Sequence, residues 1–153
     1  MTLGALTAGA EVEVVVDVPR GGFVKRGDDG DVDFVSPVPC PFNYGSVPGT
    51  RSADGDRLDA LVLGPRVARG ATIHRRVVGI VRFVDGGLDD PKLVCASAPP
   101  TSADWERIER FFRVYAAAKA VLNRLRGRRG RTAVDGVDRG MEVATRVRRR
   151  IGS

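Results

Sequence analysis

The sequence contains few cysteine, histidine and aromatic residues, and each shortage excludes a class of protein. Two cysteines, Cys40 and Cys95, are too few for a disulfide framework, and without a His–Cys–Cys group they do not support a zinc site. Nine Phe, Trp and Tyr residues leave few rings for stacking on the bases of a single-stranded nucleic acid. The one histidine, His74, lies in a β-branched stretch, so we expect it on a strand rather than in a catalytic site.

The chain also lacks long apolar runs and an early basic residue. No uninterrupted apolar run approaches the roughly 18–20 residues that span a bilayer, and the first basic residue is Arg20, which argues against a secretory signal. We therefore expect a cytoplasmic protein with reduced thiols. Its 153 residues, 42% of them apolar, are enough to bury one core without staples.

Positive charge is concentrated in the last third of the chain. The net charge is +6, but residues 1–100 carry 11 Lys and Arg against 13 Asp and Glu, whereas residues 101–153 carry 14 against 6. The segment "NRLRGRRGR" (123–131) could neutralise several phosphates of a nucleic acid. Because stacking aromatics are scarce, we expect a solvated turn or a subunit contact there and no nucleic-acid partner.

The secondary-structure pattern changes near residue 100. Short β-branched runs at 11–18, 58–63, 71–84 and 92–96 predict strands with no room for crossover helices, so we expect a mainly antiparallel sheet that could close into a small barrel. From Trp105, apolar residues recur every three or four positions and predict a helix over about 103–126, with Ser102 as the N-cap. A weaker pattern predicts a short helix over about 141–151, and we expect an exposed turn region between the two helices.

Two groups of aspartates stand beside the predicted strands. The stretch "DGDRLD" holds Asp54, Asp56 and Asp59, and three carboxylates so close together indicate either a cation site or a solvated loop. A second turn, "DGGLDDPK", adds Asp85, Asp89, Asp90 and Lys92. Carboxylates beside a lysine suit a metal–phosphate site, although a surface hairpin would have the same composition.

These motifs occur in an informative order. The series "VVVDVPRGG", "PFNYGSVPGT", "DGDRLDALVL", "GIVRFVDGGLDDPKLV" and "FFRVY" resembles the family I soluble inorganic pyrophosphatases from about Val14 to Tyr115. The resemblance implies one domain over 1–153, of class α+β but mainly β. An OB-like antiparallel barrel would occupy about 11–96, and a long helix and a short C-terminal helix would flank it within about 102–151. It further implies Mg²⁺-dependent hydrolysis of pyrophosphate by a homo-oligomer, commonly a hexamer.

The resemblance also implies roles for individual residues. Magnesium ligands would be Asp17, Asp54, Asp59, Asp85 and Asp90. Asp56 would orient or deprotonate the water that attacks phosphorus. Phosphate contacts would come from Lys25, Tyr44, Lys92 and Tyr115. Without the resemblance, Tyr115 would be assigned to the apolar stripe of its helix.

Several positions depart from the family pattern. Asp17 replaces a glutamate, Gly27 an acid, Phe34 an arginine, Cys40 a tyrosine and Ala116 a lysine. Part of the phosphate-binding set is therefore missing, and Arg26 or Lys119 could compensate. Three hypotheses remain open: a divergent pyrophosphatase, a related enzyme acting on an organic phosphate or pyrophosphate ester with the same metals, and a non-catalytic or nucleic-acid-binding barrel.

Overall fold

The first strand follows the period-two alternation of its sequence. A computed structural model describes residues 9–26, 32–36, 38–51 and 55–140, without the side chains of Arg26, Asp33 and Phe34. Strand β1 (Glu11–Val18) buries four valines, Val12, Val14, Val16 and Val18, between more exposed neighbours. This alternation is expected when one face of a strand packs on the core and the other does not.

Five strands close into a ring. They are β1, β4 (Asn43–Val47), β5 (Leu58–Val62), β8 (Lys92–Ala96) and β6 (Thr72–Asp85), in that spatial order, and β6 pairs again with β1. Every pairing in the ring is antiparallel except β5 with β8. The mainly antiparallel, OB-like barrel expected from the sequence is confirmed.

Alternate residues of the ring strands face two different hydrophobic cores. Leu58, Ala60 and Val62 of β5 pack inside the ring with apolar residues of the other four strands. Leu61, Val81 and Val94 belong to a second core, which also contains Trp105, Ile108 and Phe112 of the helix. Asp59 and Lys92 alternate with inward residues, so they lie on the outer side of the ring, where the helix packs.

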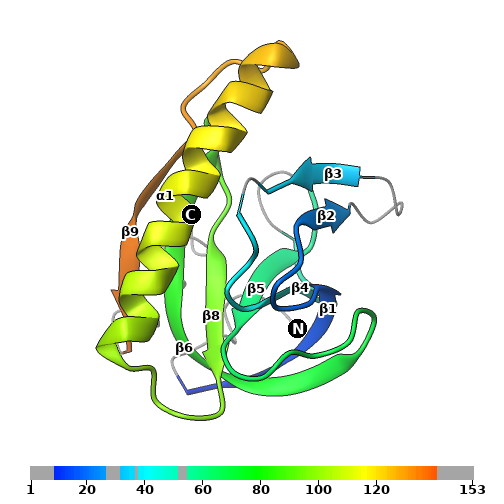
Figure 1. Ribbon diagram of the computed structural model, residues 1–153, viewed down its shortest axis with the longest axis vertical. Coiled ribbons are helices and arrows are strands. Elements are labelled where there is room, and N and C mark those ends of the chain that lie inside the picture. The colour runs from blue at the N-terminus through cyan, green and yellow to red at the C-terminus, as the bar shows by residue number, and fades with distance from the viewer. Residues whose placement is uncertain (1–8, 27–31, 37, 52–54, 141–153) are drawn as a thin grey trace.

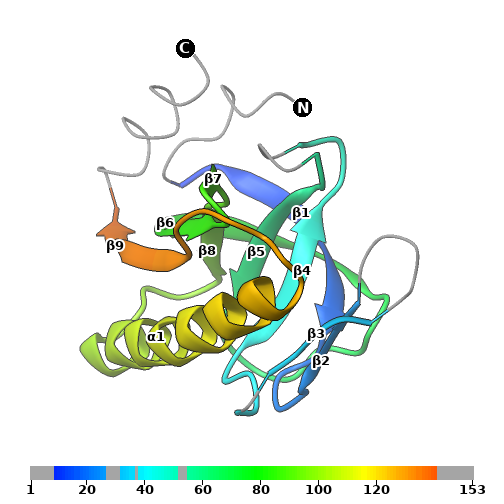
Figure 2. The same cartoon turned by 90° about the horizontal axis from the view of Figure 1, so that it is seen from above.

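Helix α1 (Ser102–Leu125) lies beside β9 across one side of the barrel (Figures 1 and 2). Its bounds agree with the predicted 103–126 within one residue. The N-cap is Thr101, so the prediction of Ser102 was wrong. Thr101 forms a capping box: its Oγ1 accepts from Asp104 N at 3.1 Å, and Asp104 Oδ2 accepts from Thr101 N at 2.8 Å. Only from Thr101 does an acid fall at the third helical position.

The expected exposed turn region after the helix contains a strand, so that prediction was wrong. Strand β9 (Ala133–Arg139) pairs antiparallel with β6. Gly136, at φ +130°, and the nearby acids made the segment look like a turn, but a bulge opposite Arg82 accommodates the glycine. The buried Asp138 carboxylate lies 3.2 Å from Arg82 Nε and ties β9 to β6.

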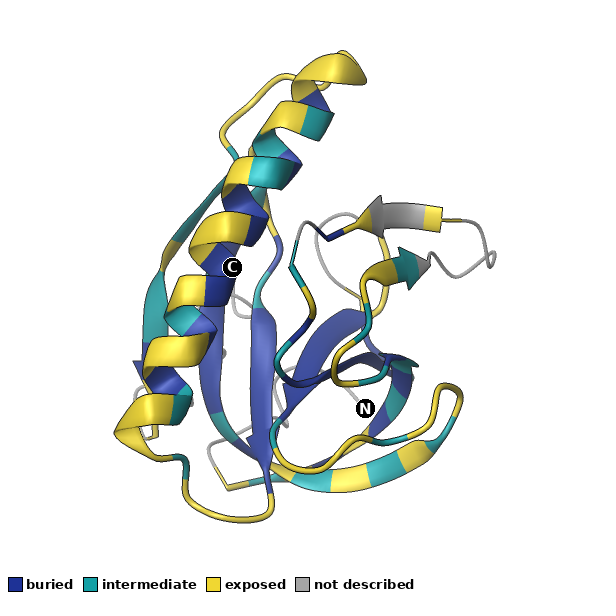
Figure 3. Cartoon of the chain, in the orientation of Figure 1, coloured by how far each residue is buried: buried dark blue, intermediate teal, exposed yellow. Residues whose placement is uncertain are grey.

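Two short paired segments complete the described fold. Strands β2 (Val24–Arg26) and β3 (Val32–Val35) form a separate hairpin whose described residues are mostly exposed (Figure 3), and β7 (Leu88–Asp89) pairs with the end of β6. Within the described ranges, no helix is both long enough and apolar enough to cross a membrane. The helix predicted over 141–151 lies outside the described residues.

Candidate active site

The parallel pairing of β5 with β8 brings together an acid and a base. Asp59 is the register partner of Lys92, and Lys92 Nζ donates to Asp59 Oδ2 at 2.7 Å. The same ammonium donates to Asp90 Oδ2 at 2.5 Å. Burial lowers the pKa of the fully buried Lys92, but the charges of Asp59 and Asp90 outweigh this and raise it. Lys92 is therefore a buried cation shared by two carboxylates.

Asp59 is the most highly coordinated carboxylate of the group. Its Oδ2 also accepts from Tyr44 Oη at 2.8 Å and from Lys25 Nζ at 3.2 Å. Burial raises the pKa of Asp59, but Lys25 and Lys92 outweigh burial and hold it below its usual range. Burial, together with the charge of Asp59, raises the pKa of Tyr44, so its hydroxyl stays a proton donor.

A second acid–base pair lies where β6 ends near the helix. Asn123 Nδ2 donates to Asp85 Oδ1 at 2.7 Å, and Lys119 Nζ lies 3.8 Å from Asp85 Oδ2. Both α1 residues are buried. They lie one helical turn apart, so they share the helix face that is turned toward Asp85.

The two groups share one cleft of about 230 Å³. Its lining includes Lys25, Asp56, Asp59, Asp85, Asp90 and Lys119. Asp56 is exposed, whereas Asp59 and Asp90 are buried. Three motifs that are far apart in the sequence therefore converge, and four carboxylates and two lysine ammonium groups line one space.

Two arginines in the cleft were missed by sequence reasoning. Arg128 and Arg129 line it, although their segment was expected to be a solvated turn or a subunit contact. A stronger signal was also overlooked: the chain has only three lysines, Lys25, Lys92 and Lys119, and all three lie at this site. Asn123, which orients Asp85, had no sequence signal beyond its place in the helix.

The other residues that were assigned roles from the resemblance do not line the cleft or lie outside the described residues. Asp17 is half-buried in β1 and is not among the residues that line the cleft. Tyr115 is buried among aromatic rings, with its centroid 5.5 Å from that of Phe83. Asp54 and Gly27 lie outside the described residues, as do the side chains of Arg26 and Phe34.

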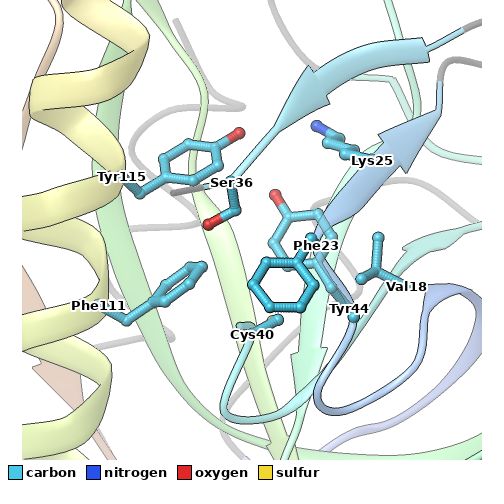
Figure 4. A pocket seen from close by; sticks show the side chains of 9 residues that line it. Val18, Phe23, Lys25, Ser36, Cys40, Tyr44, Phe111 and Tyr115 are labelled. Carbon is cyan, nitrogen blue, oxygen red and sulfur yellow. The ribbon is translucent and has the colours of Figure 1, made fainter. Parts of the chain in front are cut away.

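A small apolar pocket of about 20 Å³ adjoins the site and shares Lys25 with the cleft. Figure 4 shows Phe111 and Tyr115 projecting from α1 toward Phe23, Cys40 and Tyr44. Cys40 and Cys95 are both free thiols. Burial raises the pKa of Cys40 to about 12, so it is a small apolar side chain here and not a nucleophile.

The donor set of the cleft suits a hard divalent cation. Across the ranges that the structure describes, no three His, Cys, Asp or Glu side chains lie close enough to hold one ion. Magnesium, however, takes one or two carboxylates and completes its shell with water and substrate phosphates. Asp59 and Asp90 already share a cation, the Lys92 ammonium, so the site stabilises positive charge between them. The residues present therefore fit a divalent cation.

Comparison with known proteins identifies relatives of the chain. The family model described as inorganic pyrophosphatase matches residues 28–134. Inorganic pyrophosphatase from Gluconobacter oxydans is 39% identical over 93 residues, which cover 56% of this chain and 54% of that protein. The enzyme from Agrobacterium fabrum is 31% identical over 110 residues, covering 66% and 62%. The aligned region thus spans under two thirds of these relatives' own length.

Solved structures extend the likeness to nearly the whole chain. An inorganic pyrophosphatase from Neisseria gonorrhoeae superposes with a TM-score of 0.69 at 26% identity, covering 99% of both chains. The structure from Thermus thermophilus gives 0.70 at 28% identity, covering 97% of this chain and 95% of that one. Together with the family match over residues 28–134, these likenesses show that the chain belongs to the inorganic pyrophosphatase family.

Proposed function

We propose that this protein hydrolyses inorganic pyrophosphate to two phosphates in a reaction that requires Mg²⁺. The observation that supports this most is the shared cleft, in which Asp56, Asp59, Asp85 and Asp90 face Lys25 and Lys119. A diphosphate is a compact polyanion, and a site that binds it needs cations on several sides. Carboxylates that hold divalent ions, together with ammonium groups, would supply them.

We assign the aspartates two roles: the more buried ones bind metal, and the exposed Asp56 acts on water. Asp59, Asp85 and Asp90 would hold Mg²⁺, with Asp54 and Asp17 as further ligands by family resemblance. Bound divalent cations lower the pKa of water and neutralise charge on phosphoryl oxygens. Asp56 is exposed and lines the cleft, and its carboxylate would orient the attacking water and take its proton.

The basic residues and tyrosines would bind and orient the phosphoryl groups. Lys25 and Lys119 line the cleft and would contact phosphate oxygens directly. Lys92 neutralises Asp59 and Asp90 in the structure. When a metal ion neutralises these two carboxylates instead, the Lys92 ammonium would interact with a phosphate oxygen. Tyr44 holds Asp59 by its hydroxyl, and Tyr115 closes the apolar side of the site. Arg26 remains a candidate phosphate contact.

A second candidate substrate is a pyrophosphate ester with a small organic group. The apolar pocket beside Lys25 favours it, because Cys40 is smaller than the tyrosine expected there and leaves room next to the phosphates. An apolar substituent would gain about 0.8 kcal/mol per methylene buried. Its extent is limited, because about 20 Å³ holds little more than one small group.

Phosphate release by the purified protein tests both candidates. Pyrophosphate and a panel of organic mono- and diphosphate esters are each incubated with Mg²⁺ or with EDTA. We expect release from pyrophosphate that requires Mg²⁺, and a higher kcat/KM for an ester would favour the second candidate. If no member of the panel releases phosphate in Mg²⁺, the third hypothesis, a non-catalytic barrel, replaces both. Homo-oligomer formation, as a hexamer, and a cytoplasmic location remain predictions.

A further inference from the structure

The loop after helix α1 is fixed against the turn that follows Asp85. Gly87 N donates to Arg131 O at 2.8 Å, and Gly86 N donates to Thr132 Oγ1 at 3.0 Å. The backbones meet closely at Gly130, where an added Cβ would lie 2.6 Å from the Gly86 carbonyl oxygen. Only a glycine permits this approach, and Gly130 also has a φ of +106°, which other residues rarely adopt.

Asn123 ties the same loop to the acid of the site. Its Nδ2 donates both to Asp85 Oδ1 at 2.7 Å and to Thr132 Oγ1 at 2.9 Å, and its backbone carbonyl accepts from Arg128 N at 2.8 Å. One buried side chain therefore fixes the end of the helix, the loop and Asp85 relative to one another. The loop is therefore positioned by the turn that follows Asp85.

This attachment places two arginines in the cleft. Arg128 and Arg129 line it together with Asp56 and Asp85. In the part of the chain that the structure describes, neither guanidinium has a hydrogen bond or an ion pair, whereas Arg131 of the same loop is paired with Asp135. Ten N–H donors, five on each guanidinium, are thus available to a ligand in the cleft.

We propose that Arg128 and Arg129 bind the phosphoryl oxygens of the substrate and replace the cationic contacts that Phe34 and Ala116 do not provide. Ala116 is buried in the core between helix and barrel, so the lost charge is not restored at that position. A guanidinium stays charged and presents a planar fork that matches two phosphate oxygens. The role is binding and charge neutralisation, with no proton transferred.

The inference rests on the proposed function, because it names the residues that hold the same substrate. A binding measurement separates the two. Methylenediphosphonate, a diphosphate analogue without the cleavable oxygen bridge, is titrated calorimetrically in Mg²⁺ into the wild type and into the double variant Arg128→Ala/Arg129→Ala. The control is Arg110→Ala/Arg124→Ala, which removes the same charge from exposed α1 positions that do not line the cleft.

We expect Kd for methylenediphosphonate to rise about hundred-fold or more in the cleft variant, since it lacks two charge-assisted contacts and each is worth roughly ten-fold or more. The control should stay within about three-fold of the wild type. Arg128→Lys/Arg129→Lys should recover part of the affinity, because it keeps the charge without the planar fork. Gly130→Ala, which pushes the loop off Gly86, should weaken binding while circular dichroism stays native.

Arginine-dependent binding without pyrophosphate hydrolysis would support the inference and refute the proposed function. Equal Kd values in cleft variant and control would overturn the inference, even if pyrophosphate is hydrolysed. A wild type that does not bind methylenediphosphonate in Mg²⁺ would also overturn it. A change of oligomeric state in the cleft variant, with unchanged Kd, would assign the arginines to a subunit contact instead.

Discussion

Replacing Lys92 with methionine should destabilise the metal-free protein and make its stability depend more strongly on Mg²⁺. Lys92 is fully buried, and its ammonium separates the carboxylates of Asp59 and Asp90 at 2.7 and 2.5 Å. Because both oxygens bind one nitrogen, they lie no more than about 5 Å apart. At an effective dielectric constant of about 20, their unscreened repulsion is about 3 kcal/mol.

Protonation limits this cost. Instead of remaining charged, one carboxylate of the variant can take up a proton, which at pH 7 costs at most about 4 kcal/mol from an ordinary pKa near 3.9. The expected destabilisation is therefore about 3–4 kcal/mol, in the range for removing one partner of a buried ion pair. For a chain of this size that lowers Tm by about 10 °C.

The pH dependence of the variant's stability follows from the same protonation of one carboxylate. In the variant, the folded-state pKa of one carboxylate rises above its unfolded value, so the folded state gains relative stability as pH falls. At pH 5 protonating one carboxylate costs at most about 1.5 kcal/mol. The difference in free energy of unfolding between the variant and the wild type should therefore be smaller at pH 5 than at pH 7. The wild type shows the opposite tendency for Asp59, whose pKa lies below its usual range.

Thermal unfolding in EDTA and in Mg²⁺, at pH 5 and pH 7, measures these effects. Arg113→Met removes a cation from the exposed face of α1, where its ion pair with Glu109 is 3.8 Å long, and should change Tm little. Mg²⁺ should raise Tm more in Lys92→Met than in the wild type, because the cation replaces the lost ammonium. A variant as stable as the wild type in EDTA at pH 7, or indifferent to Mg²⁺, would refute the reasoning.

Three other substitutions or treatments separate the roles of the site residues. Asp56→Asn should lower kcat for pyrophosphate by two or more powers of ten, while the rise in Tm caused by Mg²⁺ persists; unchanged kcat would remove Asp56 from the mechanism. Asp85→Asn should weaken Mg²⁺-dependent turnover, and Asp89→Asn, its exposed neighbour outside the cleft, should not; equal effects would contradict the placement of Asp85. Cys40 and Cys95, whose pKa values burial raises to about 12, should resist a thiol reagent at pH 8 until the protein is unfolded.

The sequence pattern was sufficient to predict those strands and helices whose structure depends on neighbouring residues alone. The alternating valines of β1 and the apolar stripe of α1 gave their bounds closely, because burial of one face determines both. Strand β4 lacked a regular alternation, since all five residues of "NYGSV" are buried. Strand β9 depends on the free edge of the 14-residue β6 and on Asp138, which no local pattern could reveal.

The same distinction holds for the site. Its aspartates were found because they occur in short motifs with a recognisable order. Arg128 and Arg129 were not, because their place in the cleft depends on the contact of Gly130 with Gly86, 44 positions earlier in the chain. Lys119 was named as a substitute for the missing lysine at Ala116, and its ammonium does line the cleft, one helical turn further along α1.

The distribution of lysine and arginine explains how the cleft keeps cations opposite its carboxylates with part of the expected set missing. Of 25 basic residues, only Lys25, Lys92 and Lys119 are lysines, and all three contact an aspartate of the site. A lysine ammonium is a compact point charge, and that of Lys92 lies between two buried carboxylates. Arg128 and Arg129, in contrast, are exposed where they line the cleft. The inner site thus keeps lysines to balance its aspartates, and the positive charge missing from the strand and the helix is supplied from the loop.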